Sequence, residues 1–169
     1  MELILIRHGK AEDRQETDDH LRKLTAEGKK RLNRTLPSLG LFIRNPDKAQ
    51  IWTSPLIRAV QTADILARTF GIPDVRQHEF IGDGDYAQLT AALSDVRSSA
   101  TVIIVGHEPH LSDWSRQLCG VPLPFKKGAA ACIHLDLTDM NAGELLWFFQ
   151  PQPLGRLGET FLKNILTRF

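Results

Sequence analysis

"LILIRHG", residues 3–9, joins a short apolar run to an arginine, a histidine and a glycine. Four consecutive apolar residues, 3–6, are typical of a strand that is buried on both faces of an α/β sheet. Because unpaired polar groups in a core are costly, Arg7 and His8 are expected where this strand emerges from the core. In open α/β folds, ligands bind at the carboxyl ends of strands. The stretch therefore predicts a binding site directly after the first strand, and a plain strand end followed by a polar loop is the alternative.

The rest of the chain alternates predicted strands with predicted helices. Beyond the first strand, we expect strands over residues 49–53, 101–105, 129–137 and 143–150. We expect helices over residues 25–36, 54–71, 86–97, 110–118 and 157–167, and irregular structure over residues 74–85. No internal repeat, low-complexity stretch or linker interrupts this pattern. Alternating strands and helices indicate a layered α/β sheet within one domain.

Two of these helices have clear boundary signals. Thr25 is a suitable N-cap for the first, and Pro37 interrupts its apolar pattern, so this helix is expected to kink or end near Leu36. Ser54 is predicted to cap the next helix, with Pro55 in its first helical position. These signals place that helix directly after the preceding strand.

Charge and composition exclude several classes of function. Lysine and arginine number 21 against 20 aspartate and glutamate residues, a formal net charge of +1, so no global field attracts nucleic acid or an anionic membrane. Any preference for anions must come from a local cluster. The two cysteines, Cys119 and Cys132, are too few for a disulfide framework and lack C-x-x-C spacing. No apolar run is long enough to span a bilayer and no secretory signal is visible, so a cytoplasmic location is expected.

Three predicted strands end in residues that suit phosphate chemistry. The first delivers Arg7 and His8, the second is followed by a helix that carries Arg58, and the strand over residues 101–105 leads to His107. Taken singly, each has a simpler explanation, such as a surface ion pair, a solvated helix residue or a turn. If the three strands are parallel neighbours, however, two arginines and two histidines meet at one edge of the sheet. The coincidence at three strand ends favours a single pocket.

These residue types can bind and transfer a phosphoryl group. The planar fork of an arginine matches phosphoryl oxygens and keeps its charge at any relevant pH. A neutral imidazole nitrogen can attack phosphorus and form a covalent phosphohistidine, and a second, protonated histidine would hold the developing charge. A glycine allows close backbone approach beside the nucleophile. The candidate residues of the phosphate site are therefore Arg7, His8, Gly9, Arg58 and His107.

Four segments carry a resemblance to a known family. The signature segments of the histidine phosphatase superfamily, which has the phosphoglycerate-mutase-like fold, are matched in order by LIRHGKAE, DHLRKLTAEG, SPLIRAVQTADIL and VIIVGHEPHLS. The short length and the D-x-x-R-x-L-T-x-x-G segment most resemble the SixA-type branch, the small phosphohistidine phosphatases. The match runs from Met1 to about Leu118.

The resemblance implies a fold and a set of roles. The implied fold is a three-layer α/β/α arrangement with a mostly parallel central sheet, in a single histidine phosphatase domain over residues 1–169. By the same resemblance, His8 is the phosphorylated nucleophile, and Arg7, Arg58 and His107 complete the phosphate pocket. Beyond residue 120 the chain carries no signature of the family other than the expected final strands.

The proton donor for the leaving group is an open assignment. An alkyl phosphate releases a poor alkoxide leaving group, which must be protonated as it departs. The SixA-type segment offers Asp19, three residues before Arg22, whereas larger branches of the family use a glutamate whose position here is nearest to Glu79. Asp19 is the preferred candidate and Glu79 the alternative. Phosphohistidine releases an imidazole, which is protonated easily. A site without a strong proton donor therefore favours a phosphoramidate substrate.

The function predicted from the sequence is a metal-independent phosphatase that works through a phosphohistidine intermediate and acts on protein phosphohistidine. Between residues 72 and 101 there is room for one helix and little else, so the pocket is open to an imidazole on the surface of another protein. A phosphatase for small phosphomonoesters is the alternative, and an inactive phosphoprotein-binding module is the alternative from another class. No H-x-H or H-E-x-x-H spacing indicates zinc, and two arginines make a cation unnecessary, so no metal or cofactor is expected.

Overall fold

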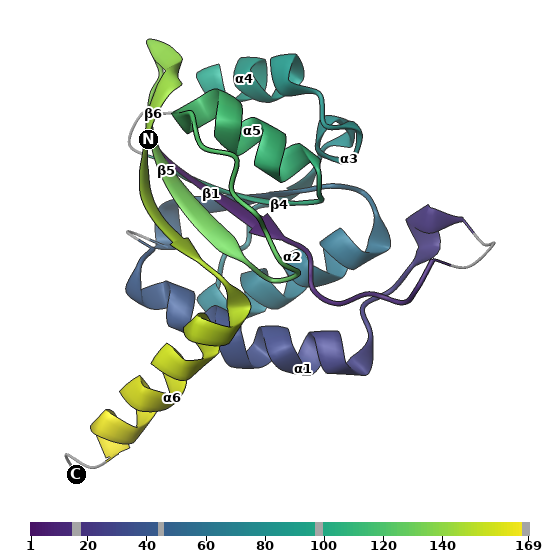
Figure 1. Cartoon of the computed structure of the whole chain (residues 1–169), viewed down its shortest axis with the longest axis vertical. Helices are drawn as coiled ribbons and strands as arrows, with labels where there is room; N and C mark the ends of the chain where they lie inside the picture. The colour runs from purple at the N-terminus through teal and green to yellow at the C-terminus, as the bar shows by residue number, and fades with distance from the viewer. Residues whose placement is uncertain (15–17, 44–45, 97–99, 167–169) are drawn as a thin grey trace.

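The computed structural model describes residues 1–14, 18–43, 46–96 and 100–166, and in this part of the chain six strands form one sheet at the centre of the molecule (Figure 1). β4 separates β1 from β2, which is the crossover order of a layered α/β sheet. Side by side, the strands are β3 (Val75–Gln77), β2 (Ala49–Thr53), β4 (Thr101–Gly106), β1 (Glu2–Arg7), β5 (Ala130–Asp136) and β6 (Asp139–Phe149).

The four strands β3, β2, β4 and β1 run parallel, so their carboxyl ends lie at one edge of the sheet. β1 pairs with β4 so that Arg7 lies beside Gly106. The next residues, His8 and His107, therefore leave the sheet as neighbours. β5 and β6 complete the other side in antiparallel pairing. The prediction that three strand ends meet is confirmed.

Helices cover both faces of the sheet (Figure 1). A hydrophobic core lies on each face of the sheet, and alternate side chains of β1 pack into the two cores. Leu3 and Leu5 pack on one face, and Ile4 and Ile6 pack on the other. The predicted three-layer α/β/α fold is confirmed. No helix in the described ranges has both the length and the apolar character needed to cross a membrane. One face carries α3 (Glu79–Asp83), α4 (Tyr86–Ser94) and α5 (His110–Cys119), and the other carries α1 (Ala26–Thr35), α2 (Ile57–Phe70) and α6 (Pro151–Leu166).

Local signals explain where α1 begins and ends, as predicted. The hydroxyl of Thr25, the N-cap, accepts a hydrogen bond from the backbone N–H of Gly28 at 3.0 Å. Pro37 lacks the N–H that a further helical turn needs, and the chain continues as a 3₁₀ segment, η2 (Leu36–Leu41). A Cβ atom on Gly28 would lie 2.1 Å from the carbonyl oxygen of Lys10. The glycine thus lets α1 pack directly on the segment that follows β1.

Two predictions for residues 54–85 are wrong. Residues 74–85 contain β3 and α3, which are too short, at three and five residues, to show a periodic pattern. α2 begins at Ile57 rather than at Pro55. The reason is that Ser54 caps a turn before the helix, where its hydroxyl accepts from the N–H of Leu56 at 3.2 Å.

The C-terminal elements follow the predicted order. Two antiparallel strands precede the last helix, as expected. α6, however, begins at Pro151 instead of residue 157, because a proline is well suited to a first helical turn that needs no N–H there. The helix predicted over residues 86–97 ends earlier, at Ser94, and residue 167, the last residue of the other predicted helix, lies outside the described residues.

Candidate active site

Four side chains meet at the carboxyl edge of the parallel strands. His8 follows β1 and His107 follows β4, and the centroids of their rings lie 4.9 Å apart. Arg58, in the first turn of α2, donates from Nε to Nε2 of His8 at 3.3 Å. Asp19, in the 3₁₀ turn η1 (Asp19–Leu21), accepts from the same arginine. Residues far apart in the sequence thus build one pocket, in which His8, Arg58 and His107 are buried.

The hydrogen bonds of His8 define which of its ring nitrogens carries the lone pair. Nδ1 lies 2.7 Å from the carbonyl oxygen of Gly9, which can only accept, so Nδ1 carries the proton. Nε2 faces the Nε–H of Arg58, which can only donate, so Nε2 carries a lone pair. The two contacts agree on one tautomer. They make Nε2 the atom that is able to attack phosphorus.

Burial keeps both histidines neutral. Desolvation lowers the pKa of His8 to about 3, and the neighbouring His107 contributes to this shift. Desolvation, followed by the charge of Arg58, also lowers the pKa of His107 to about 3. A neutral His8 is the form that nucleophilic attack requires. The protonated His107 expected from the sequence requires the negative charge of a phosphoryl group beside it.

Three buried nitrogen atoms of this pocket have no hydrogen-bond partner among the described residues. They are Nδ1 and Nε2 of His107 and Nε of Arg7. Buried polar atoms are normally paired, because an unpaired one costs about 1–3 kcal/mol. Arg7 is itself held in place, since its Nη1 donates to the carbonyl oxygen of Phe125 at 2.7 Å. The unpartnered nitrogens suit the binding of an oxyanion.

Asp19 holds Arg58 in position. Its backbone carbonyl accepts from Nη1 of Arg58 and its carboxylate accepts from Nη2, both at 2.7 Å. The carboxylate also accepts from Arg22 at 2.7 Å. Hydrogen bonds from Arg22 and then Arg58 lower the pKa of Asp19 to about 2, so this carboxyl group is ionised at neutral pH. An ionised carboxylate has no proton to give, and the role of Asp19 as proton donor stays a prediction.

The glycine after His8 has a different neighbour from the one expected. The N–H of Gly9 donates to the hydroxyl of Thr62 at 3.2 Å. A Cβ atom on Gly9 would lie 2.6 Å from Cδ1 of Leu32, on α1. The close approach that requires glycine here is therefore that of α1. A contact between Gly9 and a phosphate stays a prediction.

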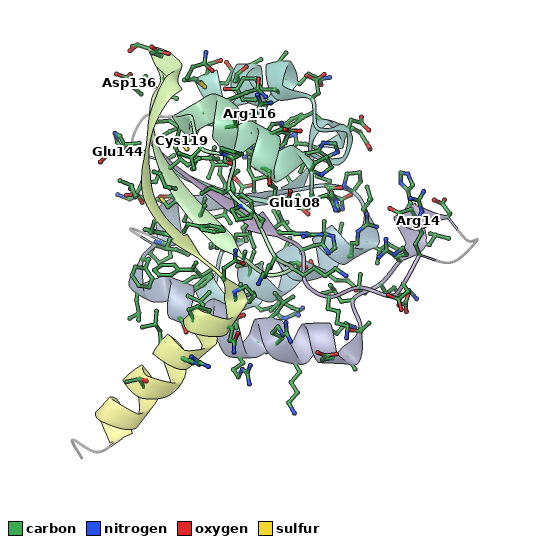
Figure 2. All side chains as sticks on the ribbon, viewed as in Figure 1. Arg14, Glu108, Arg116, Cys119, Asp136 and Glu144 are labelled. Atoms are coloured by element: carbon green, nitrogen blue, oxygen red, sulfur yellow. The ribbon has the colours of Figure 1, made fainter. Side chains whose placement is uncertain are left out.

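Two further carboxyl groups lie at this edge of the sheet. Glu79 begins α3 after β3 and is exposed, and within the described ranges it forms no hydrogen bond or ion pair with the pocket residues. Glu108, which sequence reasoning did not single out, follows His107 directly, just before α5 (Figure 2). Its Oε2 accepts from the hydroxyl of Ser112 at 2.6 Å, while Oε1 is buried without a partner among the described residues. Burial raises the pKa of Glu108. The available signal was its place next to His107 in the sequence GHEP.

We expect His8 and His107 to remain neutral at about pH 5.5, where an ordinary imidazole with a pKa near 6.5 is mostly protonated. His8 should carry its proton on Nδ1. Long-range ¹H–¹⁵N NMR spectra of protein labelled at histidine read both properties, with signals assigned from His8→Ala and His107→Ala variants. A doubly protonated His8 at this pH would contradict its burial in a neutral form, and a proton on Nε2 of the neutral ring would show that Nε2 is not the nucleophilic atom.

A model of the histidine phosphatase superfamily (branch 1) matches residues 3–101 of this chain. The chain belongs to this superfamily. The matched residues include Arg7, His8 and Arg58, and they end before His107. The structure therefore adds the second histidine to the site of this histidine phosphatase.

One relative in sequence and two solved structures are similar to this chain. The chain is 35% identical over 127 residues to an uncharacterized protein of Picosynechococcus sp., covering 70% of this chain and 73% of the relative. Its fold matches that of the protein histidine phosphatase SixA complexed with tungstate, with a TM-score of 0.80, 24% identity and coverage of 91% of this chain and 99% of the other. A putative phosphohistidine phosphatase SixA from Agrobacterium tumefaciens matches with a TM-score of 0.68, 23% identity and coverage of 89% and 97%. The superfamily recognised from the sequence is confirmed by the family model, and the fold expected for it is shared with these SixA structures.

Proposed function

We propose that this histidine phosphatase removes phosphate from phosphohistidine on other proteins, through a phosphoryl group carried transiently by its own His8. The observation that carries the proposal is the orientation of His8, whose Nε2 lone pair faces a pocket built by Arg58 and His107. The fold is shared with a protein histidine phosphatase that holds tungstate. This likeness supports the substrate class proposed for the chain.

The pocket supplies charge and donors for a phosphoryl group without needing a metal ion. Arg7 and Arg58 provide two guanidinium groups, and the Nε–H of Arg7 has no partner among the described residues. A dianionic phosphoryl group beside His107 raises the pKa of that histidine, because a neighbouring negative charge favours the protonated form. His107 then donates a hydrogen bond to the oxygens as charge develops on them.

The reaction runs in two displacements. In the first, the Nε2 lone pair of His8 attacks phosphorus, the bond to the imidazole nitrogen of the substrate breaks with its electron pair, and that imidazole takes up a proton. The carbonyl of Gly9, which accepts from Nδ1, stabilises the positive charge that develops on the ring of His8. In the second, a water oxygen attacks phosphorus, and the bond to Nε2 of His8 breaks with its electron pair returning to Nε2. Inorganic phosphate leaves with the hydrogens of the water, one of which passes to solvent, and His8 is neutral again.

The state of the nearby carboxyl groups favours a substrate that needs little acid catalysis. An alkoxide leaving group depends on a proton donor, whereas an imidazole departs readily. Asp19 is held as a carboxylate by its arginine partners. Glu79 lies exposed at the start of α3. Glu108 is the carboxyl group that burial shifts toward its protonated form. Protein phosphohistidine is the substrate class that fits this arrangement best.

The order of kcat/KM is expected to be phosphohistidine, then an aryl phosphate, then an alkyl phosphate. A donor is recognised because its removal lowers kcat/KM for the alkyl phosphate most. Since Asp19 is ionised, we expect Asp19→Asn to lower all three values by similar factors, through the position of Arg58. Glu79→Gln and Glu108→Gln are measured in the same way, and Asp64→Asn, an exposed carboxyl group on α2, is the control.

Each outcome of this comparison has a definite meaning. A wild-type preference for the alkyl phosphate would overturn the phosphohistidine assignment and establish a phosphatase for small phosphomonoesters in its place. A selective loss on alkyl phosphate in Asp19→Asn would assign the proton to Asp19. The same loss in Glu79→Gln or Glu108→Gln would assign it to that residue.

A further inference from the structure

A groove of about 630 Å³ lies beside the catalytic pocket. Arg7 belongs to both, because it ends β1 next to His8 and also lines the groove. Whatever occupies the groove therefore lies close to a phosphoryl group on His8. We call it the basic groove, and its lining includes Arg7, Arg31, Lys126, Lys127, Gln150 and Pro151.

The lining of the basic groove is strongly cationic, with four basic side chains and no acidic one. Arg31 forms an ion pair with Glu27 at 3.5 Å. Lys126 and Lys127 take part in no ion pair in the part of the chain that the structure describes. The start of α6 adds the partial positive charge of a helix N-terminus (Figure 1). Because the whole chain has a net charge of only +1, this concentration of charge is local.

The segment that carries the two lysines is held on both sides. The carbonyl of Phe125 accepts from Arg7 at 2.7 Å. The backbone N–H of Lys126 donates to Oε1 of Gln150 at 3.3 Å, and Nε2 of Gln150 donates to the carbonyl of Pro124 at 2.8 Å. A backbone that is already ordered loses less entropy when a partner binds.

We propose that the basic groove binds an acidic segment of the protein substrate, next to its phosphohistidine. This inference rests on the proposed function. It specifies the residues next to the phosphohistidine that the enzyme recognises in its protein substrate. A groove of this volume lies within the range of about 300–1,000 Å³ that holds sizeable ligands. The four cationic side chains come from separate segments, β1, α1 and the residues before β5, so they can pair with several carboxylates along a polypeptide, whereas a single phosphate contacts charges gathered at one point. The groove therefore fits several carboxylates of a polypeptide better than a second phosphate.

The experiment compares two peptides of equal length, phosphorylated on one central histidine and flanked either by glutamates or by glutamines. Wild type is expected to show a KM about tenfold lower for the glutamate peptide, and added salt should remove the difference. Lys126→Glu/Lys127→Glu should abolish this preference. Arg68→Glu/Arg116→Glu, which makes the same change of charge on α2 and α5 outside the groove, should retain it.

A second measurement separates this proposal from the proposed function. The glutamate peptide without phosphate is tested as an inhibitor of aryl phosphate hydrolysis, with the glutamine peptide and inorganic pyrophosphate alongside. Selective inhibition by the glutamate peptide that depends on the two lysines supports the groove, even if neither phosphorylated peptide is hydrolysed. Equal KM values and equal inhibition for the two peptides would overturn the groove and leave the phosphatase activity standing. Inhibition by pyrophosphate alone that depends on these lysines would assign the groove to a second phosphate and would also overturn the proposal.

Discussion

The His8→Ala variant is expected to lose about 10⁴-fold or more in kcat on phosphohistidine and aryl phosphate alike, because it removes Nε2, the nitrogen whose lone pair is proposed to form the covalent intermediate. Steady-state rates on both substrates measure the loss. His134→Ala, at an exposed position of β5, is the matched control and should retain activity. Substantial turnover by a folded His8→Ala protein would refute the mechanism.

The stability of His8→Ala at different pH values tests whether His8 is buried and neutral in the folded protein. His8 has a pKa of about 3 in the folded protein and an ordinary value near 6.5 when unfolded, so the unfolded chain binds more protons between these values. The contribution of His8 to the free energy of unfolding of wild type is therefore complete above about pH 6.5, and it is lost as the pH falls toward 3. The variant should therefore lose less stability than wild type between about pH 7 and 5, in urea unfolding at the two pH values. An equal loss in both proteins would contradict the buried, neutral state of His8.

Arg58→Ala is expected to weaken vanadate binding by about 1.5–3 kcal/mol, roughly 10- to 150-fold. The change removes a guanidinium that contacts both His8 and Asp19, and it leaves the Asp19 carboxylate beside the pocket with one cationic partner fewer. Arg58→Lys should recover little of the affinity, because a point charge cannot replace the planar fork. Calorimetric titration with vanadate measures both variants.

Arg22→Ala is the matched control for the arginine variants. Arg22 donates to the same Asp19 carboxylate at 2.7 Å but forms no hydrogen bond with His8 in the described part of the chain. Its loss should therefore cost less vanadate affinity than the loss of Arg58. Unchanged affinity in Arg58→Ala would show that this residue does not hold the phosphoryl group.

The main pocket residues are predictable from the sequence because their positions follow from what a buried strand excludes. An apolar run cannot keep Arg7 and His8 in its middle, so they must lie at its end. The apolar run of β4 places His107 at the end of its strand for the same reason. Arg58 lies in the first turn of α2, although the helix begins later than its proline suggests. These inferences use only local sequence and the rule that parallel strands share an edge.

The remaining features depend on contacts between distant residues. Asp19 and Arg58 are 39 residues apart, and no local pattern indicates that η1 folds back onto α2. The tautomer of His8 follows from two hydrogen-bond partners that only the fold brings together. Three exposed residues of β3 carry no alternation to detect. Lys126 resembles a solvated surface residue until Gln150 is seen to anchor its backbone.

The phosphorylated form of His8 is tested most directly by trapping it. Wild-type protein is mixed with phosphohistidine labelled in its phosphoryl group, quenched in alkali within milliseconds and digested for mass spectrometry. The expected result is label on the peptide that contains His8, stable in base and lost in acid, and absent from His8→Ala. Label on any residue other than His8, or the same label in His8→Ala, would contradict nucleophilic attack by His8.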